Sequence, residues 1–236
     1  MHHRVTEHRW AFAGLRLVLG ACAPIFVLLS NLYLLFTPAF VQFEYAKPGF
    51  PPSLIYEPRE RLELAQATLH YLRSDKDAAF LAGLRSRNGE VYNPREISHM
   101  VDVKMVLNTA LGVHAGAGVL CATVLFLLWR PDTARRSAWQ SVFVGCVVFI
   151  GTLLSIGLVA YVRFDLFFTA FHRAFFEGDS WLFAYSDTLI QLFPLPLWID
   201  ATWYLSLLSI AECSALAAFC WLRLRPAAAQ PSESTG

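Results

Sequence analysis

Four long apolar runs dominate this 236-residue sequence. A helix needs about 20 apolar residues to cross the hydrocarbon core of a bilayer, and each run is long enough. Hydrophobic residues make up 56% of the chain and charged residues 16%, whereas about 25% of the residues of a soluble domain are charged. The sequence therefore predicts an all-α, polytopic membrane protein with four transmembrane helices, at residues 15–36, 103–129, 139–162 and 199–222.

Arginines indicate how these helices are oriented, because positive residues in short loops stay on the cytoplasmic side. Those that flank the spans are Arg4, Arg9, Arg130, Arg135, Arg136, Arg223 and Arg225. Placing them inside puts the N-terminus (1–14), the loop 130–138 and the C-terminal tail (223–236) in the cytoplasm. Segments 37–102 and 163–198 then lie on the extracytoplasmic side of the membrane.

Segment 37–102 is expected to form a small helical cap on the outer face. Leucines and alanines recur at helical spacing after Pro58, and again from Ala78 until Asn88-Gly89, which we expect to end the second helix. No cysteine lies outside the spans, so the sequence predicts neither a disulfide framework nor a thiolate metal site. No metal or cofactor is expected. The formal net charge of +1 gives no reason to expect nucleic-acid binding.

A long helix is expected to begin at Pro94. Asn93 is a suitable N-cap, proline suits the first helical position, and Glu96 stands where a capping box needs an acid. A helix from there to the end of the second span would be about 54 Å long, whereas the hydrocarbon core is about 30 Å thick. Its first turns should project outward and carry Glu96, His99 and Asp102. The carboxylate of Asp102, three residues after His99, is placed to orient the imidazole.

The string F-H-R-A-F-F-E-G-D-S-W, residues 171–181, is unusual in so apolar a chain. It is expected to belong to an interfacial helix that Gly178 ends. The aromatic residues Phe171, Phe175 and Trp181 suit a membrane interface. His172 and Asp179 are the candidate functional residues. The alternative is that His172 is one more polar residue of an interfacial belt.

The arginine pattern places His99 and His172 on the same side of the membrane at similar depth. Ionisable residues near a bilayer are costly and mark functional sites. We therefore expect both histidines to face one site on the outer surface. The alternative reading of His99 is an ordinary polar helix end at headgroup level.

His114 lies in the middle of the second span, between Gly112 and Gly116. Small residues at this spacing allow another helix to approach closely, and a hydrogen bond from His114 to that helix is expected. A haem would need a second histidine within the spans, and there is none.

Three motifs together resemble a family of bacterial four-span membrane proteins that includes the lipoprotein intramolecular transacylase, Lit. They are E-I-S-H-M-V-D-V-K at 96–104, the string at 171–181, and S-D-T-L-I-Q-L-F-P at 186–194. The resemblance implies an acyltransferase of the bacterial plasma membrane, with its active site on the extracytoplasmic side. The implied reaction moves an acyl chain from the sn-2 position of a lipoprotein's diacylglyceryl group to the amine of its N-terminal cysteine.

This reaction explains why no serine or cysteine nucleophile motif is present, because the substrate amine is the nucleophile. The implied catalytic residues are His99, His172 and Asp102, and the implied supporting residues are Glu96, Phe171, Phe175, Asp179 and Trp181. The implied partners are a diacylated lipoprotein and membrane phospholipid. Two alternatives remain open from the residues alone: a non-enzymatic protein whose outer loops bind a lipid or protein partner, and a metal or haem protein that uses the two histidines.

Overall fold

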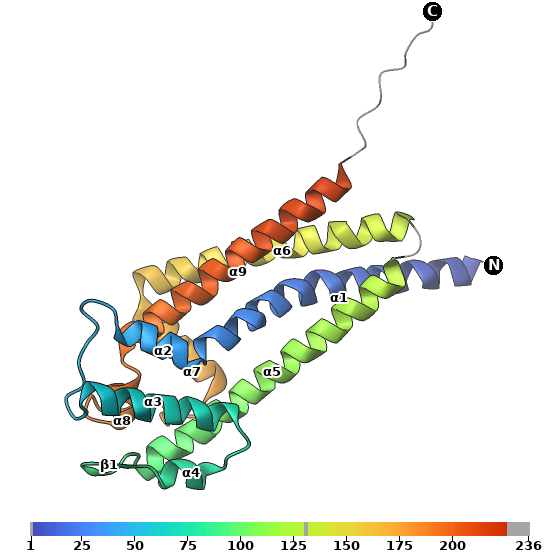
Figure 1. The fold of residues 1–236 in the computed structure, drawn as a ribbon. Helices are drawn as coiled ribbons and strands as arrows, with labels where there is room; N and C mark the ends of the chain where they lie inside the picture. Colours follow the sequence, from blue (N-terminus) through green and yellow to red (C-terminus); the bar gives the residue numbers. More distant parts are fainter. Residues whose placement is uncertain (1, 130–131, 226–236) are drawn as a thin grey trace, which may run out of the picture.

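The computed structural model describes residues 2–129 and 132–225, and it is almost entirely helical (Figure 1). In chain order its elements are α1 (His2–Leu35), α2 (Pro38–Tyr45), α3 (Pro58–Arg73), α4 (Ala78–Ala82), β1 (Arg85–Ser86), β2 (Gly89–Glu90), α5 (Pro94–Leu128), α6 (Asp132–Val162), α7 (Phe164–Phe175), α8 (Thr188–Leu192) and α9 (Leu195–Leu224). The predicted cytoplasmic loop 130–138 and tail 223–236 include residues outside the described ranges.

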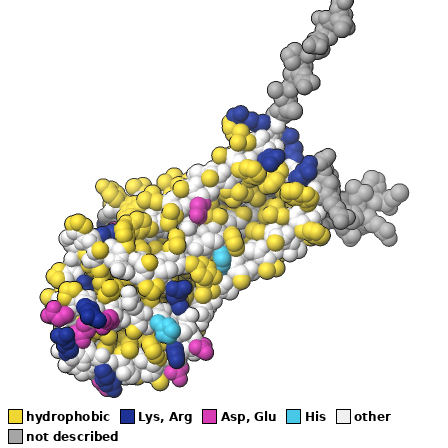
Figure 2. All heavy atoms as spheres, viewed as in Figure 1, with side chains coloured by type: hydrophobic (Ala, Val, Ile, Leu, Met, Phe, Trp, Pro, Cys, Tyr) yellow, Lys and Arg dark blue, Asp and Glu magenta, His cyan; other side chains and the backbone are white. Residues whose placement is uncertain are grey.

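Four helices are long and apolar enough to cross a membrane: Phe12–Leu35, Pro94–Leu128, Ala134–Val162 and Leu195–Leu224. This confirms the predicted all-α, four-span class. The short elements gather at one end of the long helices, away from the start of α1 and the end of α9 (Figure 1). On the face shown in Figure 2, hydrophobic side chains predominate in the middle, and most charged side chains lie toward the two ends.

Helix α1 is the centre of the bundle, since it packs against α5, α6 and α9, while α6 also packs along α9. Helices α1 and α6 cross in backbone contact: a Cβ at Gly145 would lie 1.9 Å from the carbonyl oxygen of Gly20. The close approach predicted at Gly112 and Gly116 is wrong, because a Cβ at either position would meet no described residue within 4 Å. The reason is that α1 packs on a different face of α5, at Gly118, where an added Cβ would be 2.9 Å from the Phe26 ring.

The prediction that His114 bonds to a neighbouring helix is confirmed. Its Nε2 lies 2.9 Å from the hydroxyl of Ser30 in α1, and its Nδ1 lies 3.4 Å from the hydroxyl of Tyr33. Its ring stacks on Phe26 with the centroids 4.4 Å apart. These contacts satisfy both ring nitrogens inside the bundle, which a polar group at membrane depth requires.

The two acidic residues of α9 also have partners on other elements. Glu212 accepts a hydrogen bond of 2.8 Å from the amide of Asn31 in α1. Near the outer end of α9, Asp200 pairs with Lys47 at 2.7 Å. Each acidic residue therefore connects α9 to a segment earlier in the chain.

The predicted cap is largely helical. Helices α3 and α4 pack with the first turns of α5 around one apolar cluster, whose central members are Tyr71, Leu72, Leu81, Tyr92, Met100 and Leu192. The prediction that Asn88-Gly89 ends a helix is wrong: α4 ends at Ala82, and Arg87 and Asn88 form the turn between the two-residue strands β1 and β2, with Gly89 as the first residue of β2. Gly89 has φ +105°, a backbone conformation that suits glycine and favours a tight hairpin turn.

We predict that His114→Ala lowers the stability of the bundle by about 1–2 kcal/mol, because it removes one interhelical hydrogen bond and one ring stack. The measurement is thermal unfolding of the purified protein in detergent. Thr109→Ala is the control on the same helix, since Thr109 donates to the Met105 carbonyl of its own turn and forms no side-chain hydrogen bond to another helix within the described residues. Equal melting temperatures for both variants and the wild type would contradict the assigned role of His114.

Candidate active site

The first turns of α5 carry the first predicted histidine. Asn93 Oδ1 accepts hydrogen bonds from the backbone N–H groups of Arg95 and Glu96, both at 3.0 Å. Glu96 returns the contact by accepting from the N–H of Asn93 at 2.9 Å, so the predicted capping box is confirmed. This cap fixes where α5 begins. His99 follows on the buried side of the helix and is only 7% exposed.

The second histidine lies on α7, a short amphipathic helix. Helix α6 ends at Val162, and Arg163 interrupts the helical path with φ −141° and ψ 69°. The chain then starts again in a new direction as α7. The helix predicted around His172 is present as α7, but it ends at Phe175 rather than at Gly178. Gly178, with φ +58°, lies in the turn that follows.

The two imidazoles stack. The ring centroids of His99 and His172 are 6.5 Å apart with an angle of 20° between the ring planes. Phe176 contacts both, with centroids 4.8 Å from His99 and 5.5 Å from His172. The structure therefore brings together two histidines from different helices, as the sequence predicted.

Aromatic rings enclose the pair on other sides. The centroid of the Phe168 ring is 4.1 Å from the centroid of the His172 ring, and the centroid of the Trp181 ring is 4.7 Å from it. Phe183 approaches His99 at 5.3 Å. This surrounding is apolar, so it strengthens any hydrogen bond formed inside it and disfavours charge on either ring.

The hydrogen bond of His172 assigns its protonation. Nδ1 lies 2.8 Å from the backbone carbonyl of Phe168. A carbonyl oxygen can only accept, so Nδ1 carries the hydrogen and the neutral ring has its lone pair on Nε2. Burial lowers the pKa of His172 below its ordinary value of 6.5, outweighing the opposite effect of this hydrogen bond. His172 is therefore neutral near pH 7, with Nε2 as a free base.

The predicted hydrogen bond between Asp102 and His99 is not formed. Within the described residues, Nδ1 of His99 is buried and has no hydrogen-bond partner. Asp102 shares the helix face but stays half-buried, while Phe176 and Phe183 occupy the space beside the imidazole. A carboxylate among those rings would lose its hydration without gaining a cationic partner, which explains why the pair does not form.

The residues predicted to support the site have different positions. Glu96 lies behind it, buried, and accepts a hydrogen bond of 2.8 Å from the N–H of Leu189 in α8. Trp181 lies on His172 and donates from Nε1 to the Gly178 carbonyl at 3.1 Å. Phe171 meets the His172 ring edge-on at 5.6 Å, and Phe175 packs on Phe171. Asp179 contributes its backbone carbonyl, which accepts from Arg95 at 3.2 Å.

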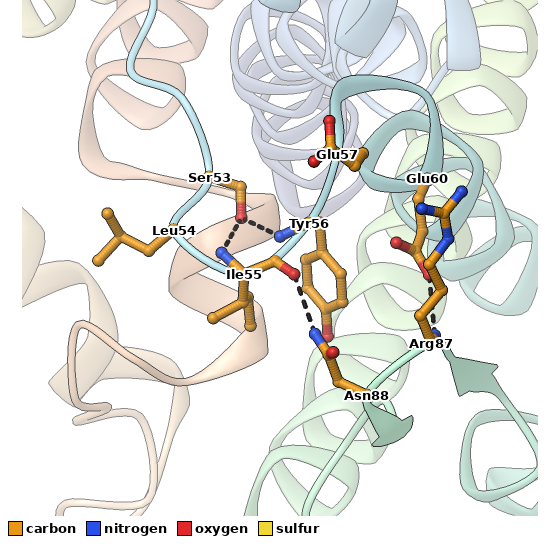
Figure 3. Close-up of a pocket in the computed structure, with 8 residues that line it drawn as sticks. All are labelled: Ser53, Leu54, Ile55, Tyr56, Glu57, Glu60, Arg87 and Asn88. Atoms are coloured by element: carbon orange, nitrogen blue, oxygen red, sulfur yellow. Dashed lines mark hydrogen bonds between the residues drawn. The ribbon is translucent and has the colours of Figure 1, made fainter.

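Two surface cavities lie in the cap, and neither is lined by His99 or His172. The first, of about 240 Å³, is lined by residues 53–57 with Glu60, Arg87 and Asn88 (Figure 3). In it the hydroxyl of Ser53 accepts from the backbone N–H groups of Ile55 and Tyr56. The second, of about 280 Å³, lies between residues 90–96 and 186–188. The histidine pair is thus an aromatic-walled site beside the bundle and not part of these cavities.

Comparison with known proteins places the chain in a family. The family model described as lipoprotein intramolecular transacylase Lit matches residues 17–198. The chain belongs to the Lit family. That description names an enzyme that transfers an acyl group. The predicted family and the predicted enzyme class are therefore both confirmed.

Individual proteins also match over most of the chain. An uncharacterized protein of Aquifex aeolicus (strain VF5) is 31% identical over 176 residues, which are 74% of this chain and 78% of that protein. The membrane-integral Lit of Bacillus cereus superposes with a TM-score of 0.68 at 17% identity, over 90% of this chain and 97% of that one. Structures of two variants of that protein, with a histidine replaced by arginine or alanine, superpose with TM-scores of 0.62. These structures show a shared fold.

Arg95 is a residue of this Lit-family site that sequence reasoning missed, as it also missed Phe168, Phe176 and Phe183 as ring contacts of the histidines. The Arg95 guanidinium donates to the carbonyls of Asp179 and Leu182 and lies 5.1 Å from the centroid of the Phe183 ring. It therefore holds the turn at 178–182 against α5. An arginine one turn before a histidine is an ordinary feature of an exposed helix end, so no pattern in the sequence marks it.

We predict that Arg95→Lys loosens this turn, because a lysine lacks the planar guanidinium that lies over the Phe183 ring and carries Nη2 to the two carbonyls. Loss of about 1–2 kcal/mol of hydrogen bonding corresponds to roughly 5- to 30-fold faster amide hydrogen exchange at 178–185. Mass spectrometry of peptides after exchange measures this. Arg59→Lys is the control, because Arg59 forms an exposed ion pair with Glu63 in α3. Unchanged exchange in Arg95→Lys and in Arg95→Ala would contradict the conclusion that Arg95 holds the turn at 178–182 against α5.

Proposed function

We propose that this Lit-family chain transfers the sn-2 acyl group of a lipoprotein's diacylglyceryl cysteine to the α-amine of the same cysteine. The product is an N-acylated lyso-form lipoprotein. The observation that carries the proposal is the stacked pair of His99 and His172, walled by aromatic rings, with Nε2 of His172 available as a base. The substrate supplies both the nucleophile and the electrophile, so the protein needs to supply only position and proton transfer.

In the proposed mechanism His172 is the general base. The cysteine amine attacks the sn-2 carbonyl carbon, the new N–C bond forms, and the carbonyl π electrons move to its oxygen. Nε2 of His172 takes the proton that the amine loses. The electron pair on the carbonyl oxygen then re-forms the C=O bond, and the bond from carbon to the glycerol oxygen breaks. The glycerol oxygen takes the proton from the His172 imidazolium, leaving an amide and a free sn-2 hydroxyl. His99 donates a hydrogen bond to the departing oxygen.

Proton transfer and positioning by the protein can each contribute a large rate acceleration to this reaction. Proton transfer by a positioned side chain contributes about 10²–10⁴-fold in rate. Holding an amine beside an ester of the same molecule converts a bimolecular reaction into a unimolecular one, which is worth more still. The lowered pKa of His172 has the right sign, because the neutral imidazole is the form that accepts a proton.

The exposed aromatic residues beside the histidines also suit a substrate that is anchored in the membrane by its acyl chains. Phe171 and Phe175 on α7 are 45% and 52% exposed, although both are large apolar residues. A membrane-facing aromatic surface next to the histidines can contact the acyl chains of the lipoprotein and the surrounding phospholipid. The alternative, a non-enzymatic protein that binds a lipid or protein partner, uses the same surface without the chemistry, and the assay below separates the two.

We predict that His99→Ala and His172→Ala each reduce transacylation by about 100-fold or more. The substrate is a synthetic diacylglyceryl cysteine peptide, incubated with the purified protein in detergent. Because the acyl group stays on the same molecule, the intact mass does not change. The measurement is therefore the N-acyl fragment in tandem mass spectrometry, together with loss of reaction with an amine-specific reagent.

His70→Ala is the matched control for this assay, since His70 is exposed on α3 and belongs to the cap rather than to the site. It should react at the wild-type rate. Wild-type rates in both site variants would refute histidine catalysis. No N-acyl product from the unaltered protein would favour the partner-binding alternative.

We further propose that both termini are cytoplasmic and that the site is extracytoplasmic. The cap and the histidine pair lie at one end of the molecule. The start of α6, with Arg135 and Arg136, and the end of α9, with Arg223 and Arg225, lie at the other end. This distribution agrees with the rule that positive residues stay inside. A diacylated lipoprotein carries its lipid in the membrane, so its reacting groups lie at the depth of the site.

This orientation predicts the behaviour of fused reporters. Alkaline phosphatase, which is active only after export, should be inactive when fused after Arg136 and active when fused after Asn88. A fluorescent protein that folds in the cytoplasm serves as the reciprocal control at both positions. Activity of the phosphatase after Arg136 would place the site on the wrong side for the proposed substrate.

A further inference from the structure

The turn at residues 178–182 contacts both histidine-bearing helices. Its Asp179 and Leu182 carbonyls accept from Arg95 of α5. Its Trp181 ring lies 4.7 Å from His172 of α7. Ser180 stands between these contacts in the chain. The turn therefore forms part of the wall around the imidazoles.

Most polar groups of the turn are used to hold its shape. The carbonyl of Gly178 accepts from Trp181 Nε1, and the carbonyl of Asp179 accepts from the N–H of Leu182 at 3.1 Å as well as from Arg95. The indole N–H of Trp181 and the Nη2 group of Arg95 are therefore already engaged as donors. Turning either group toward a substrate would break a contact of the turn.

The hydroxyl of Ser180 is a buried side-chain group of the turn for which the described residues supply no partner. Among the described residues only three buried side-chain atoms lack a hydrogen-bond partner, namely Glu44 Oε2, His99 Nδ1 and Ser180 Oγ. Two of the three belong to the elements that surround the histidine pair. A buried hydroxyl without a partner costs about 1–3 kcal/mol, and this one belongs to the turn whose next residue, Trp181, contacts His172. Its position in the chain therefore points to a ligand of the histidine site as the missing partner.

We propose that the Ser180 hydroxyl donates a hydrogen bond to the sn-2 carbonyl oxygen of the bound ester and stabilises the oxyanion that develops on it. This inference rests on the proposed transacylation. Attack by the amine moves the carbonyl π electrons onto that oxygen, and collapse of the intermediate returns them as the glycerol oxygen leaves. Ser180 keeps its own proton throughout and forms no covalent bond. Its contribution comes from a donor that is already in place in an apolar site before charge develops.

A serine suits this role better than the neighbouring groups. Ser180 has one O–H that rotates to meet an acceptor, and no other partner competes for it within the described residues. Loss of one oxyanion donor in hydrolases costs about 10²–10³-fold in kcat. We expect an effect of about 10²-fold here, because His99 remains to polarise the departing oxygen.

The test compares Ser180→Ala, Ser180→Thr and, as a control, Ser186→Ala, an exposed serine of the same outer loop. Ser180→Ala should lower kcat by about 10²-fold with the melting temperature unchanged or slightly higher, because no hydrogen bond of the fold is lost. Ser180→Thr, which keeps the hydroxyl, should recover at least part of the rate. Ser186→Ala should match the wild type.

A second measurement separates catalysis from packing. A lipopeptide analogue with a phosphonate in place of the sn-2 ester carbonyl presents tetrahedral oxygens, which resemble the oxyanion. Ser180→Ala should lose affinity for this analogue by about the factor lost in kcat/KM, and keep its affinity for the lyso-form product. Equal loss of both affinities, or a lowered melting temperature, marks a packing role and overturns the inference.

The outcome also separates this inference from the transacylation itself. If His172→Ala is inactive while Ser180→Ala turns over at the wild-type rate, the oxyanion role of Ser180 is overturned and the proposed function stands. If the unaltered protein gives no N-acyl product, the proposed function falls and the inference falls with it.

Discussion

The carboxylate of Glu96 connects two segments that lie 93 positions apart in the chain. One of its oxygens accepts from the backbone N–H of Asn93 and fixes where α5 begins. The other accepts from the N–H of Leu189 and fixes α8 against that helix end. Burial raises the cost of an unpaired acceptor, so loss of either contact would destabilise this junction. The chain between α7 and α8 then has to return across the start of α5, and this path places its aromatic residues over His99.

The aromatic wall determines what the two imidazoles can do. Phe176 and Trp181 cover part of the two rings, and the Phe168 carbonyl selects the tautomer of His172. A buried imidazole resists protonation, which leaves a base ready at neutral pH. The same apolar surroundings leave Nδ1 of His99 without a partner. The site thus holds polar groups whose hydrogen bonds remain to be completed by a substrate, whereas His114 in the middle of the bundle is fully satisfied.

The long helices and the cap have different structural roles. The bundle around α1 supplies an apolar body that fits a bilayer, and its crossing with α6 is so close that Gly20 and Gly145 meet through their backbones. The cap supplies a conventional water-side core. Buried Arg61 illustrates its construction, since it donates to the backbone carbonyls of Gln191 and Pro51 and thereby joins α3 to α8. The histidines lie at the boundary between these two environments, one on a spanning helix and one on a helix beside the bundle.

The sequence by itself determined the four spans, the start of α5 and the pairing of His99 with His172 in one region. Each follows from a local rule: apolar length, capping chemistry, or charge in short loops. Only the tertiary structure decided which groups touch the imidazoles. Asp102 has the right spacing on α5, yet Phe176 and Phe183 from another segment occupy the space beside His99. Spacing along a helix specifies which face a side chain shares, whereas the neighbour that reaches it depends on how distant segments pack.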